Sequence, residues 1–266
     1  MSLVSKYGYY ARSIVTLLTG FRDPVNVVRI FLGLAGDGPT EVALKESGLR
    51  FSIRSAMDAW VIKETCIDQD YLWAIGRLQD DWRIIDIGAG LGDFTVFAAK
   101  ECPRGVVHAY EPYAQSFNLL TANLALNQIA NAVPTPEAVA SKHGRLNIDA
   151  TLPEAVRVRT AAGADGPSDD TVAAISLAEA LDRLPGAECD FMKVDCEGGE
   201  FDIVMNSPPD VLRRVKRMSL ETHDGVVAAG RGELAEYLRQ HGFEVRVRPN
   251  PVHAYLAFLY AERRGL

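Results

Sequence analysis

A strand, a glycine-rich turn and a helix follow one another between residues 83 and 99, and this unit constrains the fold more than any other part of the chain. The apolar run Arg83–Ile87 is typical of a buried parallel strand, and residues 94–99 are typical of the helix that follows. Glycines 88, 90 and 92 lie between them. Because glycine has no Cβ, a ligand can lie against the backbone N–H groups of such a turn. The sequence therefore predicts a nucleotide-like ligand at the carboxyl edge of an open α/β sheet.

An acidic residue follows the second predicted strand, residues 106–110. This is Glu111, 25 positions after Asp86, where a carboxylate can accept the hydroxyl protons of a ribose. A dinucleotide with a pyrophosphate favours the spacing Gly-x-Gly-x-x-Gly, whereas this turn reads Gly-x-Gly-x-Gly and is followed by Asp93. An aspartate at that helix start repels a pyrophosphate but suits a cationic or neutral ligand such as S-adenosylmethionine. A nicotinamide-dependent oxidoreductase is therefore the second hypothesis.

Two later strands carry polar residues at alternate positions. Residues two apart on a strand face the same way, so Lys193 shares a face with Asp195, and Glu221 shares one with His223. Buried polar groups are costly unless they are paired, so a cluster of them at strand ends favours a functional site. We expect the two pairs to meet beside the glycine turn.

These segments together resemble the FkbM family of S-adenosylmethionine-dependent methyltransferases. The resemblance covers about residues 42–262. It is carried by the stretch from Asp86 to Thr95, the Tyr110-Glu111-Pro112 step, the string Lys-x-Asp-x-Glu-Gly-x-Glu that begins at Lys193, and the Glu-x-His that begins at Glu221. The resemblance implies a Rossmann-like class I methyltransferase fold, an α/β sheet that is mostly parallel with an antiparallel edge hairpin. It also implies two parts, an N-terminal helical and hairpin cap over residues 1–80 and a cofactor-binding domain over residues 81–266.

The resemblance also assigns cofactor-binding residues. Those expected to contact S-adenosylmethionine are Asp86, Gly88, Ala89, Gly90, Gly92, Asp93, Phe94, Glu111, Pro112, Glu137 and Asp195, with Asp58 from the cap. Glu64 and Tyr71 are further cap candidates for cofactor or substrate contact. Glu200 begins a predicted helix, where it either caps free N–H groups or contributes to the site.

The implied reaction is transfer of a methyl group to a nucleophile, with a hydroxyl oxygen as the expected acceptor atom. An alcohol needs a base to take its proton. His223 is the first candidate because imidazole titrates near pH ~6.5, and Asp195 is the second. Glu221 is expected to orient the imidazole, and Lys193 to act in catalysis or to neutralise the carboxylates. In an alternative arrangement, Asp195, Glu221 and His223 hold Mg²⁺ and bind a diol through it.

The amino-acid composition limits the classes of molecule that this protein is expected to bind. The chain of 266 residues has a net charge of −7, which lacks the basic excess that nucleic-acid binding requires. We therefore expect a small-molecule acceptor, such as a sugar, a glycolipid precursor or a polyketide-type metabolite. The four cysteines show no disulfide pattern and indicate a reducing cytoplasm. The apolar residues 13–21 are too short for a membrane span and lack a convincing cleavage site.

The sequence leaves the oligomeric state and the catalytic activity open. The apolar N-terminal helices could form a homodimer. The third functional hypothesis is a protein that binds the cofactor without turnover and serves as a partner of other proteins.

The sequence pattern also predicts the order of helices and strands. The expected elements are cap helices at 7–18, 25–34 and 59–78, a hairpin at 41–45 and 49–54, strands near 84–87, 106–110, 132–139, 190–195, 216–222, 243–247 and 254–260, helices near 93–100, 113–126, 172–184, 199–206 and 231–240, and a loop at 161–170.

Overall fold

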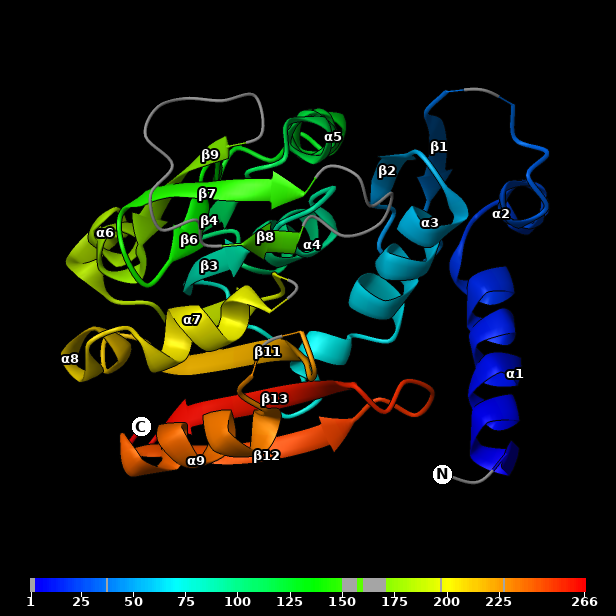
Figure 1. Ribbon diagram of the computed structural model, residues 1–266. Helices are drawn as coiled ribbons and strands as arrows, with labels where there is room; N and C mark the ends of the chain where they lie inside the picture. Colours follow the sequence, from blue (N-terminus) through cyan, green and yellow to red (C-terminus); the bar gives the residue numbers. More distant parts are fainter. Residues whose placement is uncertain (1–2, 37, 150–156, 160–170, 197, 227) are drawn as a thin grey trace.

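A seven-stranded sheet forms the centre of the computed structural model, which describes residues 3–266 apart from 37, 150–156, 160–170, 197 and 227. The strand order is β12-β13-β11-β10-β3-β4-β5 (Figure 1). The strands are β3 (Arg83–Ile87), β4 (Val106–Tyr110), β5 (Ala132–Thr135), β10 (Phe191–Val194), β11 (Arg217–His223), β12 (Phe243–Pro249) and β13 (Leu256–Arg263). All neighbouring pairs are parallel except those made by β13, which runs antiparallel to β11 and β12. The predicted mostly parallel sheet with an antiparallel edge hairpin is confirmed.

Helices cover both faces of this sheet because alternate strand residues point to opposite sides. Ile84 of β3 belongs to one hydrophobic core and its neighbour Ile85 to the other. Helices α4 (Asp93–Glu101) and α5 (Ala114–Leu126) contribute to the first core. Helices α6 (Leu177–Asp182), α7 (Gly199–Met205), α8 (Pro209–Leu212) and α9 (Arg231–Gln240) contribute to the second. The helices predicted near 93–100, 113–126, 199–206 and 231–240 are confirmed.

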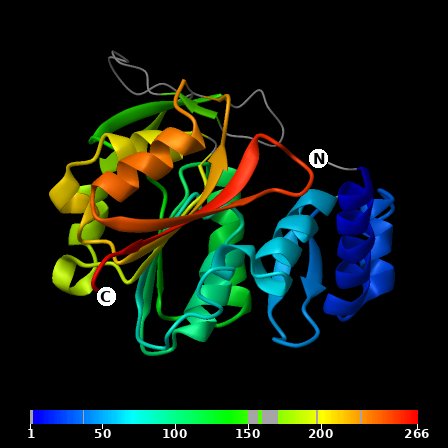
Figure 2. The same cartoon turned by 90° about the horizontal axis from the view of Figure 1, so that it is seen from below.

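The cap packs beside the carboxyl edge of the sheet. It consists of α1 (Leu3–Gly20), α2 (Pro24–Phe31), the antiparallel hairpin β1 (Thr40–Ala43) and β2 (Arg50–Ile53), helix α3 (Ala56–Ile62), a π-helical turn η1 (Lys63–Ile67) and a 3₁₀ turn η2 (Asp70–Leu72). Its buried residues share the first core with α4 and α5. The cap and the following part of the chain, which the predicted boundary near residue 80 divides, therefore share a hydrophobic core. Figure 2 shows α1 and α2 together on the side of the cap that faces away from the central sheet.

Two predicted helices are wrong, and the one strand predicted near 132–139 is divided between two sheets. The helix expected over 59–78 ends at Leu72 and changes to π and 3₁₀ turns after Ile62. The helix expected over 172–184 begins only after Ser176, whose hydroxyl caps it, because residues 171–176 form a strand. That strand belongs to a second sheet that the sequence did not predict, made of β6 (Ala138–Ala140), β7 (Gly144–Asp149), β8 (Arg157–Arg159) and β9 (Thr171–Ser176). The loop predicted at 161–170 lies outside the described residues.

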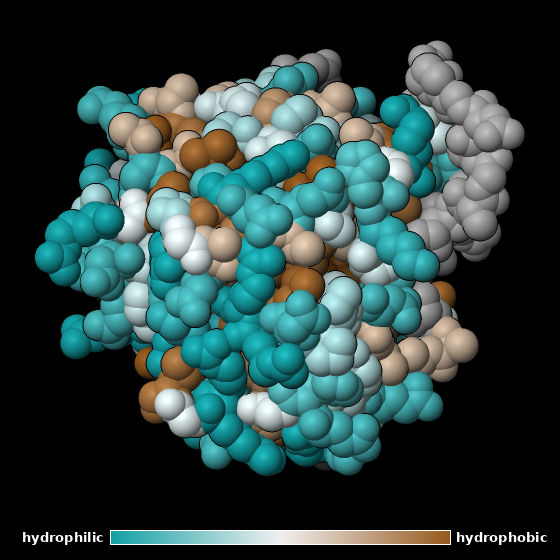
Figure 3. Space-filling view, turned by 90° about the vertical axis from the view of Figure 1, so that its left-hand side faces the viewer, coloured by the Kyte–Doolittle hydropathy of each residue, from teal (hydrophilic) through white to brown (hydrophobic). Residues whose placement is uncertain are grey.

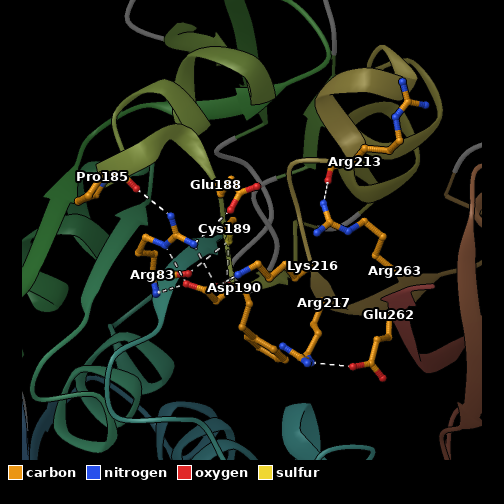
Figure 4. A network of polar contacts seen from close by, with 11 residues as sticks. Arg83, Pro185, Glu188, Cys189, Asp190, Arg213, Lys216, Arg217, Glu262 and Arg263 are labelled. Atoms are coloured by element: carbon orange, nitrogen blue, oxygen red, sulfur yellow. Dashed lines mark hydrogen bonds and ion pairs between the residues drawn. The ribbon is translucent and has the colours of Figure 1, made fainter. Parts of the chain in front are cut away.

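An ion-pair network joins three strands at the amino-terminal edge of the central sheet (Figure 4). Asp190, just before β10, accepts hydrogen bonds from Arg83 of β3 at 2.8 Å and from Lys216, just before β11, at 2.7 Å. Burial opposes ionisation, but these two cations outweigh it and lower the pKa of Asp190 to about 2. The network fixes the strands at the edge opposite the glycine turn.

Across the residues that the structure describes, none of the helices has both the length and the apolar content that crossing a membrane requires.

Candidate functional site

The glycine turn between β3 and α4 packs directly against the loop that follows β10. Gly88 has a φ of +72°, and a Cβ placed there would lie 1.8 Å from the carbonyl oxygen of Asp195. Gly90 also has a positive φ, +55°, but a Cβ placed there would meet no atom within 4 Å. The first glycine is therefore required by packing, whereas the second faces open space that a ligand can fill. Gly92 packs against Leu120 of α5, and Ala89 is buried.

Glu111 ties the turn to the end of β4. Its carboxylate accepts hydrogen bonds from the backbone N–H groups of Gly90 and Tyr113, both at 2.8 Å. Burial raises the pKa of Glu111 to about 7, although both hydrogen bonds favour the charged form. Pro112, which follows it, is half-buried. The acid predicted to hold a ribose thus lies against the open side of the turn.

Lys193 acts as the counter-ion of the turn. Its ammonium donates to the carbonyl oxygen of Gly88 at 2.6 Å and lies 3.2 Å from the Asp86 carboxylate. Burial opposes its charge, but Asp86, Asp195 and Asp93 outweigh this and raise its pKa above the ordinary lysine value. Lys193 therefore stays protonated and neutralises the carboxylates. This arrangement does not favour Lys193 as a base.

The remaining residues of the turn region are buried. Asp86 is fully buried and accepts a hydrogen bond from the Thr95 hydroxyl at 2.6 Å. Burial raises the pKa of Asp93 to about 6, with Lys193 opposing the shift. The ring of Phe94 lies 5.8 Å from that of Tyr71 and 6.0 Å from that of Phe191, in the core.

The predicted polar cluster forms at the carboxyl ends of β10 and β11. These strands are parallel neighbours with Val194 opposite Leu220, so the residues after them meet. Asp195, Glu221 and His223 each offer one atom within 4.8 Å of the others. Burial and then the charge of Asp195 raise the pKa of Glu221 well above its ordinary range. The sequence prediction that these three side chains come together is confirmed.

Tyr71 from the cap reaches the same cluster. Its hydroxyl donates to Asp195 at 2.8 Å and lies 3.5 Å from Glu221. Burial, followed by these two negative charges, raises the pKa of Tyr71 well above 10. The cap therefore supplies a hydrogen-bond donor between the two carboxylates, in agreement with the selection of Tyr71 as a cap candidate.

Glu200 binds the imidazole of His223, a contact that the sequence led us to expect from Glu221. One oxygen of the Glu200 carboxylate lies 3.2 Å from His223 Nδ1 and accepts the His223 backbone N–H at 2.8 Å. Its other oxygen accepts the backbone N–H of Gly198 at 2.6 Å. Glu200 is fully buried, so both contacts are shielded from water. Glu200 thus does both things that the sequence suggested, because it caps a free N–H group at the start of α7 and contacts a residue of the polar cluster.

Two predicted cofactor residues are engaged in ion pairs. Asp58 lies 2.9 Å from the Arg54 guanidinium, which also donates to the Ser116 hydroxyl. Glu137 lies 2.5 Å from Arg183. Their direct contact with a cofactor stays a prediction.

The cap brings Glu64, a candidate from the sequence, together with residues that the sequence did not single out, namely Tyr9, Asp70 and Arg248. Tyr9 of α1 donates to Glu64 at 2.7 Å, and Arg248 of β12 forms a 2.7 Å ion pair with Asp70. Burial is the main cause of the raised pKa of Glu64, and the charge of Glu64 in turn raises the pKa of Glu221. The π-helical turn that positions Glu64 was not predicted, because a single turn of this kind leaves no periodic pattern in the sequence.

The sheet order, the glycine turn after β3, the acid after β4 and the polar cluster after β10 and β11 define a class I methyltransferase. The family description "Methyltransferase FkbM domain" matches residues 86–245, more than half of the chain. The protein belongs to this family, as the resemblance of its motifs implied.

Three named relatives share about a quarter of their aligned residues with this chain. The 31-O-demethyl-FK506 methyltransferase FkbM of Streptomyces tacrolimicus is 26% identical over 224 residues, covering 73% of this chain and 85% of that protein. Methyltransferase sdnD of Sordaria araneosa is 26% identical over 225 residues with the same coverage. The AMB antimetabolite synthetase AmbE of Pseudomonas aeruginosa is 24% identical, and the match spans 11% of its length.

A solved structure shows the same fold. The methyltransferase FkbM from Methylobacillus flagellatus aligns with a TM-score of 0.51 at 13% identity, covering 77% of this chain and 54% of that one. At this identity the likeness concerns the fold alone.

Proposed function

We propose that this methyltransferase uses S-adenosylmethionine to methylate a hydroxyl oxygen of a small molecule. The observation that carries the proposal is the placement of two groups at one sheet edge. Lys193 links the two groups, because it donates to Gly88 of the turn that Glu111 binds and lies 3.9 Å from Asp195 of the cluster with Glu221 and His223. The first group fits a nucleoside and the second fits a reacting hydroxyl.

The turn residues fit S-adenosylmethionine by their chemistry. Glu111 offers carboxylate oxygens to ribose hydroxyls, and Gly90 leaves open space beside the backbone. Asp86 and Asp93 add negative charge that a sulfonium nucleoside tolerates and a pyrophosphate does not. When bound, this cofactor supplies an electrophilic methyl group. Asp195 and Lys193 would then border its amino-acid end.

The cluster residues position and activate the acceptor. Holding the hydroxyl at attack distance is worth roughly 7–11 kcal/mol of the barrier, and a base adds about 10²–10⁴-fold. His223 is the base in this proposal because the Glu200 carboxylate binds its Nδ1, which favours the tautomer that carries a lone pair on Nε2. Tyr71 holds Asp195 and lies beside Glu221, which keeps both carboxylates in place next to the acceptor.

The relatives support the acceptor class. One is named as a 31-O-demethyl-FK506 methyltransferase, which acts on an oxygen of a small molecule. The net charge of −7 also disfavours a nucleic-acid acceptor.

Calorimetry with S-adenosylhomocysteine and with NAD tests the cofactor. Binding of the former alone supports the proposal, and binding of NAD alone contradicts it in favour of an oxidoreductase. Incubation of the protein with cell extracts and S-adenosylmethionine labelled in the methyl group, followed by mass spectrometry, identifies the acceptor. His223→Ala should then lose transfer but keep cofactor binding, and Asp195→Ala should lose transfer. Unchanged transfer in both variants would contradict the assigned roles.

The same cluster favours one competing arrangement. Asp195, Glu221 and His223 lie close enough together to hold a divalent cation, and Mg²⁺ would then bind a diol of the acceptor. The Lys193 ammonium, 3.9 Å from Asp195, and the Tyr71 hydroxyl already satisfy part of that charge. Transfer that persists in EDTA supports the base mechanism. Transfer that stops in EDTA and returns with Mg²⁺ supports the metal.

A further inference from the structure

The outward side of the two N-terminal helices is apolar. On α1, Ser13 and Leu17 face the protein and are buried. The opposite side of α1, the outward side of α2 and the residues after it expose large apolar side chains, which are Tyr7, Tyr10, Ile14, Val15, Leu18, Val25, Val28, Phe31, Leu32 and Leu34. The exposed fraction reaches 70% at Tyr7, 69% at Val25 and 66% at Leu32. We call these ten side chains the N-terminal apolar face.

The N-terminal apolar face exposes more apolar surface than is usual for a monomeric protein. At the exposed fractions given, side chains of this size leave roughly 1,000 Å² of surface open, whereas the largest apolar patch of a typical monomer measures about 300–600 Å². The opposite end of the molecule, over α6 and α8, is mostly hydrophilic with small scattered apolar groups (Figure 3). Helix α2 is apolar on both sides, with Val27 and Ile30 buried and Val25 exposed, and such a helix normally has both sides covered.

The charge around the face is positive, although the chain is acidic. Residues 1–34 contain four basic residues and one acid, Asp23, a net charge of +3, against −7 for the whole chain. Arg12, Arg22 and Arg29 are exposed beside the apolar side chains. No acidic residue occurs in the first 22 positions of the sequence.

We propose that the N-terminal apolar face binds an anionic lipid membrane surface. Apolar side chains on a helix that lies in the interface enter the acyl boundary, and arginines beside them contact lipid phosphates. Tyrosines such as Tyr7 and Tyr10 suit the headgroup level. A second copy of this chain is the weaker partner, because a symmetric contact would place two positively charged faces against each other.

Membrane contact would involve the acceptor side of the site. Tyr9, on the inward side of α1, donates to Glu64 at 2.7 Å. Helix α1 thus lies between the lipid surface and Glu64. This placement does not depend on the identity of the methyl acceptor.

Vesicle co-sedimentation of the full chain tests the proposal. The vesicles are phosphatidylcholine alone, and phosphatidylcholine partly replaced by phosphatidylglycerol. A net charge of +3 at the surface corresponds to about a 100-fold preference for the anionic vesicles at low salt, and this preference should fall steeply at high salt. Equal binding to both vesicles, or no binding to either, overturns the proposal.

Single substitutions test whether vesicle binding depends on the N-terminal apolar face or on another part of the surface. Ile14→Asp and Leu32→Asp should each reduce vesicle binding at least about tenfold, because each places a charge in the acyl boundary. Val133→Asp, at an exposed valine of β5 outside the face, is the matched control and should bind like the unaltered protein. Binding of S-adenosylhomocysteine and circular dichroism check that each variant folds. Equal losses in all three variants overturn the assignment.

Light scattering after size exclusion examines the second-copy alternative. A monomer in the absence of vesicles supports the proposal. A dimer that Ile14→Asp dissociates assigns the face to a second copy and overturns it.

Discussion

One oxygen of the buried Glu200 carboxylate contacts both the backbone N–H and the Nδ1 of His223. A carboxylate in this position selects the tautomer in which Nδ1 carries the proton and Nε2 accepts one. A residue on the helix after β10 thus sets the chemistry of a residue at the end of β11. Glu200 is therefore a positioning residue for the proposed base.

Replacing Glu200 with Gln should lower kcat of methyl transfer about 10–100-fold while leaving the affinity for S-adenosylhomocysteine unchanged. The neutral amide no longer stabilises an imidazolium, so the acid limb of the kcat profile should move to lower pH. Asp202→Asn, on the same helix, is the control, because Asp202 bonds Ser141 and not His223. A lower kcat with an unmoved acid limb would indicate a merely structural role.

Affinity for S-adenosylhomocysteine should rise with pH through about 7. Burial raises the pKa of Glu111 to about 7, and in the proposed function its carboxylate accepts hydrogen bonds from both ribose hydroxyls when it is ionised. Binding at pH 6 should be about tenfold weaker than at pH 8, because most of the carboxyl is protonated at the lower pH. Calorimetry at both pH values measures this, and Glu111→Gln should bind weakly at both. A wild-type affinity that does not vary with pH contradicts the assignment.

Two alanine substitutions in the glycine turn should behave differently. Gly88→Ala forces its Cβ against the Asp195 carbonyl, so the turn must shift and the free energy of unfolding should fall by about 2–4 kcal/mol. Gly90→Ala meets no neighbour and costs only the roughly 1–2 kcal/mol of a left-handed backbone, but its methyl occupies the ligand space. Urea unfolding and calorimetry should therefore show a mainly structural loss for the first and a mainly binding loss for the second. Equal cofactor affinity in Gly90→Ala and the unaltered protein would remove that turn from the binding site.

Asp190→Asn should destabilise the protein at neutral pH. The pKa of Asp190 is about 2 in the folded state and ~3.9 in an unfolded chain, so its ionisation contributes about 2 kcal/mol above pH ~4. That contribution is lost as the pH falls through the folded pKa, near 2. The difference in unfolding free energy between variant and wild type should thus shrink from pH 6 to pH 2.5 in urea titrations. Asp182→Asn, whose carboxylate bonds the partly exposed Arg214, should cost less than about 1 kcal/mol.

The sequence by itself determined the central sheet and the position of the site. Buried strands such as Arg83–Ile87 are continuous apolar runs, and parallel strands bring their carboxyl ends to one edge. Asp86, Glu111, Asp195 and Glu221 therefore had to meet there. Local spacing was enough because each of these residues lies within two positions of the carboxyl end of a strand that the pattern reveals.

The second sheet could not be predicted from the local sequence pattern. Residues 171–176 precede the helix that begins at Leu177, and a short apolar strand leading into a helix resembles the helix itself. The pairing of β9 with β6 and β7 decides its conformation.

Only the tertiary structure decided which side chains pair inside the site. The contacts of Glu200 with His223, of Tyr71 with Asp195 and of Tyr9 with Glu64 join residues 23 to 124 positions apart. Such contacts depend on strand register and on how the cap packs, and neither leaves a repeat in the sequence. Strand periodicity placed the charged groups at one edge, and packing chose their partners, because burial makes every unpaired charge costly.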